Sequence, residues 1–160
     1  MEIRLEEEIA ALLREHGLTI AVAESASGGL ISHLITNVPG SSDYFRGGVV
    51  AYDNEVKVKV LGVSRGTLAR YGAVSCETGE EMAQGVKRLM NANIGLSDTG
   101  IAGPTGATPG KPVGLFYIGI SSDLGASAVE HIFSGDRLQN KRSAAEVALT
   151  MLKEHLLRLK

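Results

Sequence analysis

The sequence has no tryptophan, one cysteine, four prolines and only 4% aromatic residues among its 160 positions. A single cysteine cannot close a disulfide within the chain, which favours a reducing, cytoplasmic location. No apolar run approaches the roughly 20 residues that a membrane-spanning helix requires, and the first ten residues lack the basic-then-apolar order of a signal peptide. The formal net charge is −2, so no basic field attracts nucleic acid. We therefore expect neither a nucleic-acid partner nor a membrane partner.

Glycine, by contrast, is abundant, with 20 residues in 160 against a usual share of about 7%. These glycines follow no triplet period, and 44% of the residues are hydrophobic, which excludes a collagen-like fibre and a disordered chain. Five glycines lie in residues 25–48 and five in residues 99–114, so half of them occupy 40 of the 160 residues. Glycine permits sharp turns and close backbone approach, and these two segments are therefore candidate ligand loops.

Hydrophobic periodicity predicts alternating helices and strands followed by a pair of strands. Helices are expected at 3–15, from Leu30 onward, at 54–60, 64–72, 78–90 and 137–159, and strands at 19–24, 47–52, 94–98, 113–120 and 127–133. Thr78-x-x-Glu81 has the form of a capping box, and the last two strands are expected to pair antiparallel. The pattern predicts a single domain over residues 1–160, a three-layer α/β/α sandwich on a mixed, mainly parallel sheet of about five strands.

Two loops leave the carboxyl ends of predicted strands, at residues 25–29 and 99–114. Ligands of open α/β sheets bind beyond such ends. Gly28 and Gly29 allow close backbone approach, and the amides of the helical turn that follows suit an anion or a developing oxyanion. The alternative for Ser25 to Ser27 is a helix cap with small packing residues. Composition alone favours that alternative.

Several familiar sites are missing from the sequence. Gly110-Lys111 is followed by Pro112 rather than Ser or Thr, so there is no phosphate-binding Walker loop. The four histidines are dispersed and the single Cys76 has no partner for a zinc site, so we expect no metal. A nucleophilic Ser25 would need a base, and a lysine deprotonated by burial can serve. By spacing alone, however, Lys57 is a solvated helix residue, Tyr52 a strand aromatic and Arg137 a surface charge.

Eight short segments, taken in order, resemble the carboxy-terminal domain family of the CinA competence/damage-inducible proteins, whose members include stand-alone nicotinamide mononucleotide deamidases. Together they extend over nearly the whole chain. The segments are Ala23-Glu-Ser-Ala-Ser-Gly-Gly29, Pro39-Gly-Ser-Ser42, Gly48-Val-Val-Ala-Tyr-Asp-Asn-Glu-Val-Lys57, Leu61-Gly-Val63, Tyr71-Gly-Ala-Val-Ser75, Thr99-Gly-Ile-Ala-Gly-Pro104, Lys111-Pro-Val-Gly114 and Phe133-Ser-Gly-Asp-Arg137.

The resemblance implies an amidohydrolase that converts nicotinamide mononucleotide and water to nicotinate mononucleotide and ammonia, in NAD recycling, without a cofactor. The family's serine falls on Ser25 and its lysine on Lys57, so Lys57, directly or through Ser42, is expected to deprotonate Ser25, with Tyr52 assisting. Ser27 stands where many members have Thr and keeps the hydroxyl. The expected substrate-binding residues, of which Thr99 and Arg137 match family contacts and Arg137 suits a phosphate by its charge, are Ser27, Gly28, Gly29, Thr99, Gly100, Gly103 and Arg137.

Two other functions remain open. The chain could be a non-catalytic nucleotide- or partner-binding module that keeps the pocket, or an amidohydrolase of a related pyridine such as free nicotinamide. The resemblance also implies a homo-oligomer, a dimer or larger. The family's molybdopterin-binding-like amino-terminal domain is not among these 160 residues, so functions tied to that domain are not expected here.

Overall fold

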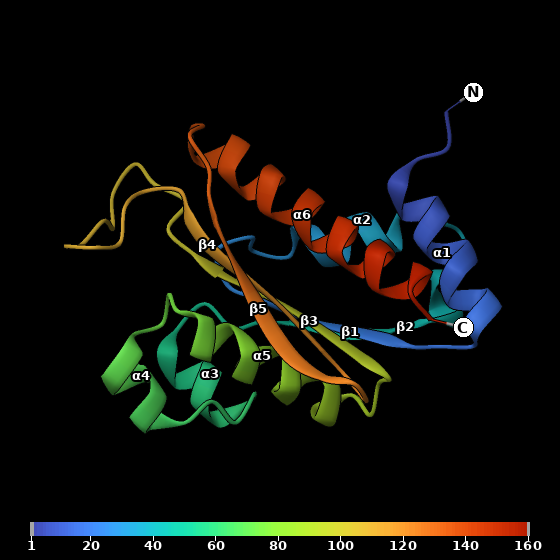
Figure 1. The fold of residues 1–160 in the computed structure, drawn as a ribbon, viewed down its shortest axis with the longest axis horizontal. Helices are drawn as coiled ribbons and strands as arrows, with labels where there is room; N and C mark the ends of the chain where they lie inside the picture. Colours follow the sequence, from blue (N-terminus) through green and yellow to red (C-terminus); the bar gives the residue numbers. More distant parts are fainter. Residues whose placement is uncertain (1, 160) are drawn as a thin grey trace.

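The computed structural model describes residues 2–159, and in them five strands form one mixed sheet (Figure 1). The sheet order is β2-β1-β3-β4-β5. β1 pairs in parallel with both β2 and β3, whereas β4 is antiparallel to both β3 and β5. Only β4 therefore runs against the other four, which confirms the predicted mixed, mainly parallel sheet. The strands are β1 (Ile20–Glu24), β2 (Phe45–Val50), β3 (Ile94–Gly100), β4 (Leu115–Ser122) and β5 (Gly125–Ile132).

Helices cover both faces of the sheet, which confirms the three-layer architecture (Figure 1). One face carries α1 (Leu5–His16), α2 (Leu30–Thr36) and α6 (Arg137–Leu157). The other face carries α3 (Asn54–Lys59), α4 (Arg65–Tyr71) and α5 (Cys76–Leu89). A short 3-10 turn, η1 (Ser41–Asp43), precedes β2.

The central strand β1 explains how one sheet supports two cores. All five of its residues are buried, and side chains alternate between the faces of a strand. Ile20 and Val22 join the larger apolar cluster under α1, α2 and α6, whereas Ala21 and Ala23 join the smaller cluster under α5. Because both faces of β1 are buried, its residues are apolar up to Ala23. Polar residues begin with Glu24 and Ser25, at the carboxyl end of the strand.

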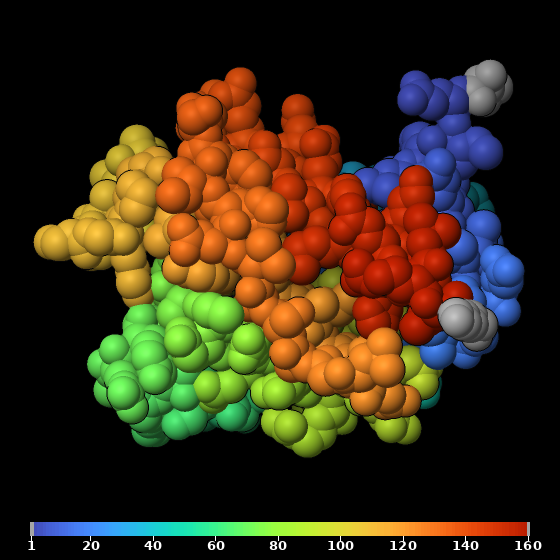
Figure 2. All heavy atoms as spheres, in the orientation of Figure 1, coloured from blue at the N-terminus to red at the C-terminus, as the bar shows by residue number. Residues whose placement is uncertain are grey.

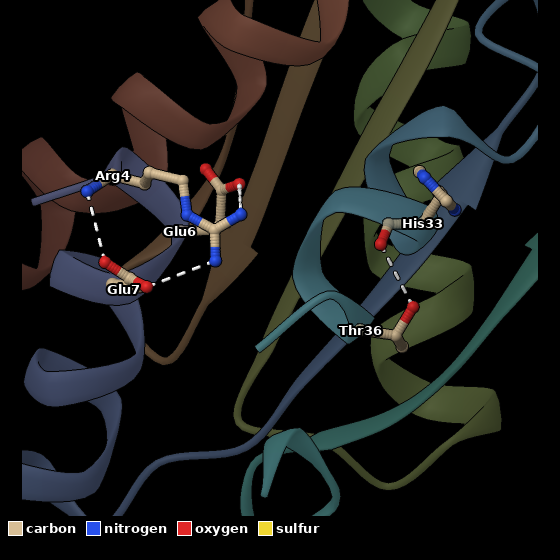
Figure 3. Close-up of polar contacts among 5 residues, drawn as sticks. All are labelled: Arg4, Glu6, Glu7, His33 and Thr36. Carbon is tan, nitrogen blue, oxygen red and sulfur yellow. Dashed lines mark hydrogen bonds and ion pairs between the residues drawn. The ribbon is translucent and has the colours of Figure 1, made fainter. Parts of the chain in front are cut away.

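The polar contacts drawn in Figure 3 lie at the ends of α1 and α2. The Arg4 guanidinium donates to Glu7 Oε1 at 3.1 Å, beside the first turn of α1. On α2, the Thr36 hydroxyl donates to the backbone carbonyl of His33 at 3.1 Å, and the His33 side chain is exposed (Figure 3). His33 therefore turns outward on a helix that leads away from Ser25, as expected for a residue that is not the base.

Several predicted bounds were wrong: β4 lies two residues later than predicted and β5 begins two residues earlier. Two further differences have local causes. α5 begins at Cys76, not near Thr78, because the Ser75 hydroxyl accepts from the Thr78 N–H at 3.2 Å and caps the helix three residues earlier. β2 runs two residues earlier than predicted and ends at Val50. It ends there because the carbonyls of the next two residues turn toward the side chain of Lys57.

The glycine-rich segment after β3 projects from the body of the molecule, as the yellow lobe of Figure 2 shows. Its base is closed where the Gly114 N–H donates to the Ile101 carbonyl at 2.7 Å. At its tip, Thr108 and Lys111 form an isolated antiparallel bridge. Among the described residues, no helix combines the length and the apolar character that crossing a membrane requires.

Candidate active site

Ser25 and Lys57 meet beyond the carboxyl end of β1. Ser25 directly follows that strand, and Lys57 lies on α3, whose first turn is capped by the Asp53 side chain. Both side chains are buried, and that of Lys57 is only 1% exposed. Lys57 Nζ donates to Ser25 Oγ at 3.1 Å. The expectation from spacing alone, that Lys57 is solvated, was wrong, and the structure brings it to Ser25 without an intervening residue.

Two backbone carbonyls complete the surroundings of the Lys57 amine. Nζ donates to the Ala51 carbonyl at 2.8 Å and to the Tyr52 carbonyl at 3.2 Å. An ammonium group would use its three N–H bonds on these two carbonyls and Ser25. A neutral amine would give its two N–H bonds to the carbonyls and direct its lone pair at the Ser25 hydroxyl. The three observed contacts therefore also fit a neutral Lys57 amine that accepts the proton of Ser25.

The surroundings favour the neutral form of Lys57. Burial lowers the pKa of Lys57, and the charges of Asp98 and Asp53 oppose this shift without cancelling it. Desolvation penalises a charged amine inside a protein, because the interior cannot replace the water around it. Lowering a lysine pKa in this way is the ordinary means of making it a base near neutral pH.

Two buried carboxyl groups support the turn from Ser25 to Ser27. Asp98, on β3, accepts from the Ser25 N–H at 2.9 Å and from the Ser27 N–H at 3.0 Å. Glu24, the last residue of β1, accepts from the Ser27 hydroxyl at 2.6 Å and from the Ile31 N–H at 2.8 Å. Sequence reasoning missed both residues. Each is an acidic residue at the carboxyl end of a predicted buried strand. A carboxylate in such a position is costly unless it is hydrogen-bonded, so this pattern could have identified both residues.

A cavity of about 210 Å³ opens over the Ser25 and Lys57 pair. The other predicted site residues that lie in its wall are Tyr52, Thr99, Gly100 and Arg137. The residues that sequence analysis missed are Ala26, Asn54, Ala73, Val74 and Ala102. All five lie within the matched segments, but they carry no nucleophilic or ionisable group that would distinguish them there as site residues.

Arg137 links three segments at the mouth of this cavity. It is the first residue of α6, after the Asp136 cap. One of its Nη atoms donates to the Gly103 carbonyl at 2.8 Å and the other to the Tyr52 hydroxyl at 3.2 Å. Thr99 is more deeply placed, and its hydroxyl donates to the Ala73 carbonyl at 2.6 Å. The mouth therefore presents a fixed cation, whereas the floor presents a serine and an amine.

Other selected residues lie away from the cavity. Ser42 is exposed in η1, which precedes β2, and the start of β2 pairs with the start of β1, so Ser42 and Ser25 lie at opposite ends of these strands. A relay from Lys57 through Ser42 to Ser25 is therefore not formed within the chain. Ser27 is 1% exposed and bonded to carboxyl groups rather than open to substrate. Gly28 and Gly29 shape the turn with φ values of 62° and 103°, which other residues rarely adopt.

These observations define a three-layer α/β domain with a buried serine and lysine pair at the carboxyl end of its central strand. The family model described as the CinA C-terminal domain matches residues 2–156. The chain therefore belongs to the CinA C-terminal domain family.

Relatives and solved structures agree with this assignment. The chain is 50% identical to a putative competence-damage inducible protein of Caldicellulosiruptor saccharolyticus, over 96% of this chain and 37% of that protein. It therefore spans less than two fifths of the length of that curated relative. The crystal structure of competence damage-inducible protein A from Klebsiella pneumoniae superposes with a TM-score of 0.94 at 30% identity, covering 98% of this chain and 97% of that one. For the competence/damage inducible protein of Agrobacterium tumefaciens, the TM-score is 0.87 at 34% identity, covering 99% of this chain and 100% of that one.

Proposed function

We propose that this chain hydrolyses the carboxamide of nicotinamide mononucleotide, giving nicotinate mononucleotide and ammonia. The observation that carries the proposal is the buried amine of Lys57 at 3.1 Å from Ser25 Oγ, under a cavity with a cation at its mouth. The family membership supports an amidohydrolase, and the resemblance of the eight segments supports this substrate. Arg137 suits the phosphate of the mononucleotide, because a guanidinium forms strong charge-assisted hydrogen bonds with phosphate oxygens.

The reaction proceeds through an acyl-enzyme. Ser25 Oγ forms a bond to the amide carbon while its proton passes to the Lys57 amine. The tetrahedral intermediate expels ammonia as Lys57 returns the proton to the departing nitrogen. Water then attacks the ester carbon and gives a proton to Lys57. The bond to Ser25 Oγ breaks, Lys57 returns that proton to Ser25 Oγ, and the nicotinate carboxyl group is released. No step in this sequence passes through Ser42.

A backbone amide of the same turn can hold the oxyanion. The N–H groups of Ser25 and Ser27 are both used by Asp98. Within residues 2–159, the Ala26 N–H donates to no protein group, and Ala26 lines the cavity. We assign this amide to the developing oxyanion, because a donor without a partner costs little to reorganise when charge appears.

Release of ammonia from the mononucleotide tests the proposal. Wild type should release it, and Ser25→Ala should reduce the rate by at least about 10³-fold while still binding the substrate in calorimetry. Full activity of Ser25→Ala would remove Ser25 as the nucleophile. Binding of the mononucleotide to wild type without product would favour the non-catalytic nucleotide-binding module. Turnover of free nicotinamide at a comparable rate would instead favour the related amidohydrolase.

The remaining expectations accompany this function as proposals. We propose that the chain acts as one domain in the cytoplasm, with the small-molecule substrate as its partner, without nucleic acid or membrane, and that it assembles as a homo-oligomer. The single cysteine supports the location. Light scattering at enzyme concentration measures the assembly, and a monomer mass would contradict it.

A further inference from the structure

One hydroxyl lies between two buried carboxyl groups beneath the nucleophile. Ser27 Oγ is hydrogen-bonded to Glu24 Oε1 at 2.6 Å and also to Asp98 Oδ1. All three residues are at most 1% exposed. A serine hydroxyl has one hydrogen and can donate to only one of these oxygens. The other carboxyl group must therefore supply its own hydrogen if both bonds are formed.

The remaining hydrogen bonds indicate which carboxyl group is protonated. Glu24 accepts from three further donors, the N–H of Ile31 and both the N–H and the hydroxyl of Ser32, at 2.8, 3.0 and 2.7 Å. Asp98 accepts from two, the N–H groups of Ser25 and Ser27. Donors stabilise the ionised form of a carboxyl group. The hydrogen therefore belongs on Asp98, which donates it to Ser27 Oγ while Ser27 donates to Glu24.

The electrostatics of Asp98 agree with this placement. Burial raises the pKa of Asp98 to about 6, hydrogen bonds from Ser27 and the Ser25 amide oppose the rise, and the charge of Glu24 adds to it. The ionisable groups that face Asp98 are Glu24 from β1 and Lys57 from α3. From α6, Lys141 reaches the outer side of the turn, where its Nζ lies 3.3 Å from the position that a Cβ on Gly28 would occupy.

We infer that Glu24, Ser27 and Asp98 form a buried chain that shares one proton between its two carboxyl groups, and that Asp98 is the positioning residue of the Ser25 turn. The chain places one negative charge, not two, beneath the nucleophile. The charge of Asp98 favours the ammonium form of Lys57, so the shared proton lowers the pKa of that amine while it is bound, and its loss above about pH 6 raises that pKa again. This consequence for the reaction rests on the proposed function, whereas the shared proton does not.

Carboxyl carbon-13 NMR over a pH series tests the shared proton without any substrate. The Asp98 resonance of the same protein unfolded in urea serves as the reference. Asp98 should titrate at least about one pH unit higher in the folded protein than in the unfolded protein. In Glu24→Gln the Asp98 midpoint should fall by about one pH unit or more, because a negative charge is removed and the Ser27 hydroxyl is then free to donate to Asp98. Equal Asp98 midpoints in the folded and the unfolded wild type would overturn the inference, even if Glu24→Gln does not fold.

Kinetics test the positioning role. Asp98→Ala leaves the N–H groups of Ser25 and Ser27 without their acceptor, and we expect kcat to fall on the order of 10-fold or more with KM unchanged. Asp98→Asn keeps an acceptor and a donor and should recover most of kcat. Its pH–activity profile should rise from a lower pH than that of the wild type, because wild-type Asp98 is charged above about pH 6 and stabilises the Lys57 ammonium. A KM effect alone, or no recovery in Asp98→Asn, would contradict the role. A wild type without turnover would defeat the proposed function while leaving the titration result intact.

Discussion

Leu152, on the buried face of α6, and Lys57, on the floor of the cavity, are both almost completely buried, at 0% and 1% exposed. Around Leu152 the neighbours are apolar, and its burial contributes about 1.5–3 kcal/mol to folding. Around Lys57 the neighbours are two carbonyls and a hydroxyl, with the charges of the buried Asp98 and the exposed Asp53 also acting on it. Removal from water stabilises the apolar core, but it destabilises the charged form of Lys57. The pKa of Lys57 is lowered as a result. The fold thus uses burial for stability in one region and for reactivity in the other.

Replacing the buried amine by an apolar chain should separate these two uses most clearly. We expect Lys57→Met to reduce ammonia release by at least about 10³-fold, also at alkaline pH, because no base remains for Ser25. The free energy of unfolding should change by only about 1 kcal/mol, since a buried charge is costly even when it is hydrogen-bonded. Steady-state kinetics and urea unfolding measure the two effects.

Lys59→Met is the matched control, because it makes the same change on the same helix at a side chain that is 73% exposed. It should leave both quantities near the wild type. Activity of Lys57→Met close to that of Lys59→Met would refute the role of Lys57 as the base.

A substitution in the larger apolar cluster should have the opposite effect, on stability rather than on activity. Leu152→Ala should lower the free energy of unfolding by about 2–5 kcal/mol, because the lost methyl groups leave a cavity. It should leave kcat of the folded enzyme unchanged, since Leu152 lies away from the residues that line the cavity. Leu157→Ala, on the same helix at a residue that is 60% exposed, should cost at most about 0.5 kcal/mol. Equal losses in the two variants would show that the cluster does not carry the stability assigned to it.

Asp98 gives the site a dependence of stability on pH that the apolar cluster cannot have. Its pKa is raised in the folded chain from 3.8 to about 6, so between these values the native state binds a proton that the unfolded state has lost. Stability therefore falls as pH rises through this window, by about 3 kcal/mol in all. The free-energy difference between wild type and Asp98→Asn, measured by urea unfolding from about pH 4 to about pH 7, should follow this fall.

Subtracting the free energy of unfolding of Asp98→Asn cancels the contributions of surface carboxyl groups whose pKa is lowered, which make the fold more stable as pH rises. Arg4 and Arg65 lower the pKa of Glu7 and Glu55 on the surface, and these contributions are common to both proteins. A difference that stays constant across the pH range would mean that Asp98 titrates alike in the folded and unfolded chain.

Much of the fold could be predicted from local patterns. The run from Ile20 to Ala23 is apolar because β1 is central, and the stripe on α6 is apolar because it faces the larger cluster. The end of β2 at Val50 could not be predicted from hydrophobic spacing, because the next two carbonyls accept hydrogen bonds from the Lys57 amine. Hydrophobic periodicity does not reveal a polar contact between a lysine and backbone carbonyls five and six residues before it.

The site was predictable only through the resemblance, and only in part. Ser25 and Lys57 are 32 positions apart, and no periodicity relates a strand end to a helix that returns to it. Ser42 was misplaced for the same reason, since a matched segment gives order along the chain but not the end of the sheet at which it lies. Glu24 and Asp98 were missed because each lies within a strand that reads as buried.

The smallest change in activity is expected from replacing Arg137, a site residue whose charge is exposed to solvent. Arg137 is exposed at the mouth of the cavity, and its charge costs little to maintain there, so it can bind a ligand but does not tune a pKa. Arg137→Ala should raise KM for the mononucleotide about 10-fold, the value of one charge-assisted hydrogen bond, with kcat little changed. Turnover of any analogue without the phosphate should not change, and Arg142→Ala, at an exposed arginine on the same helix, should have no effect. A fall in kcat with KM unchanged would instead place Arg137 with Lys57, among the groups that act on the reacting amide.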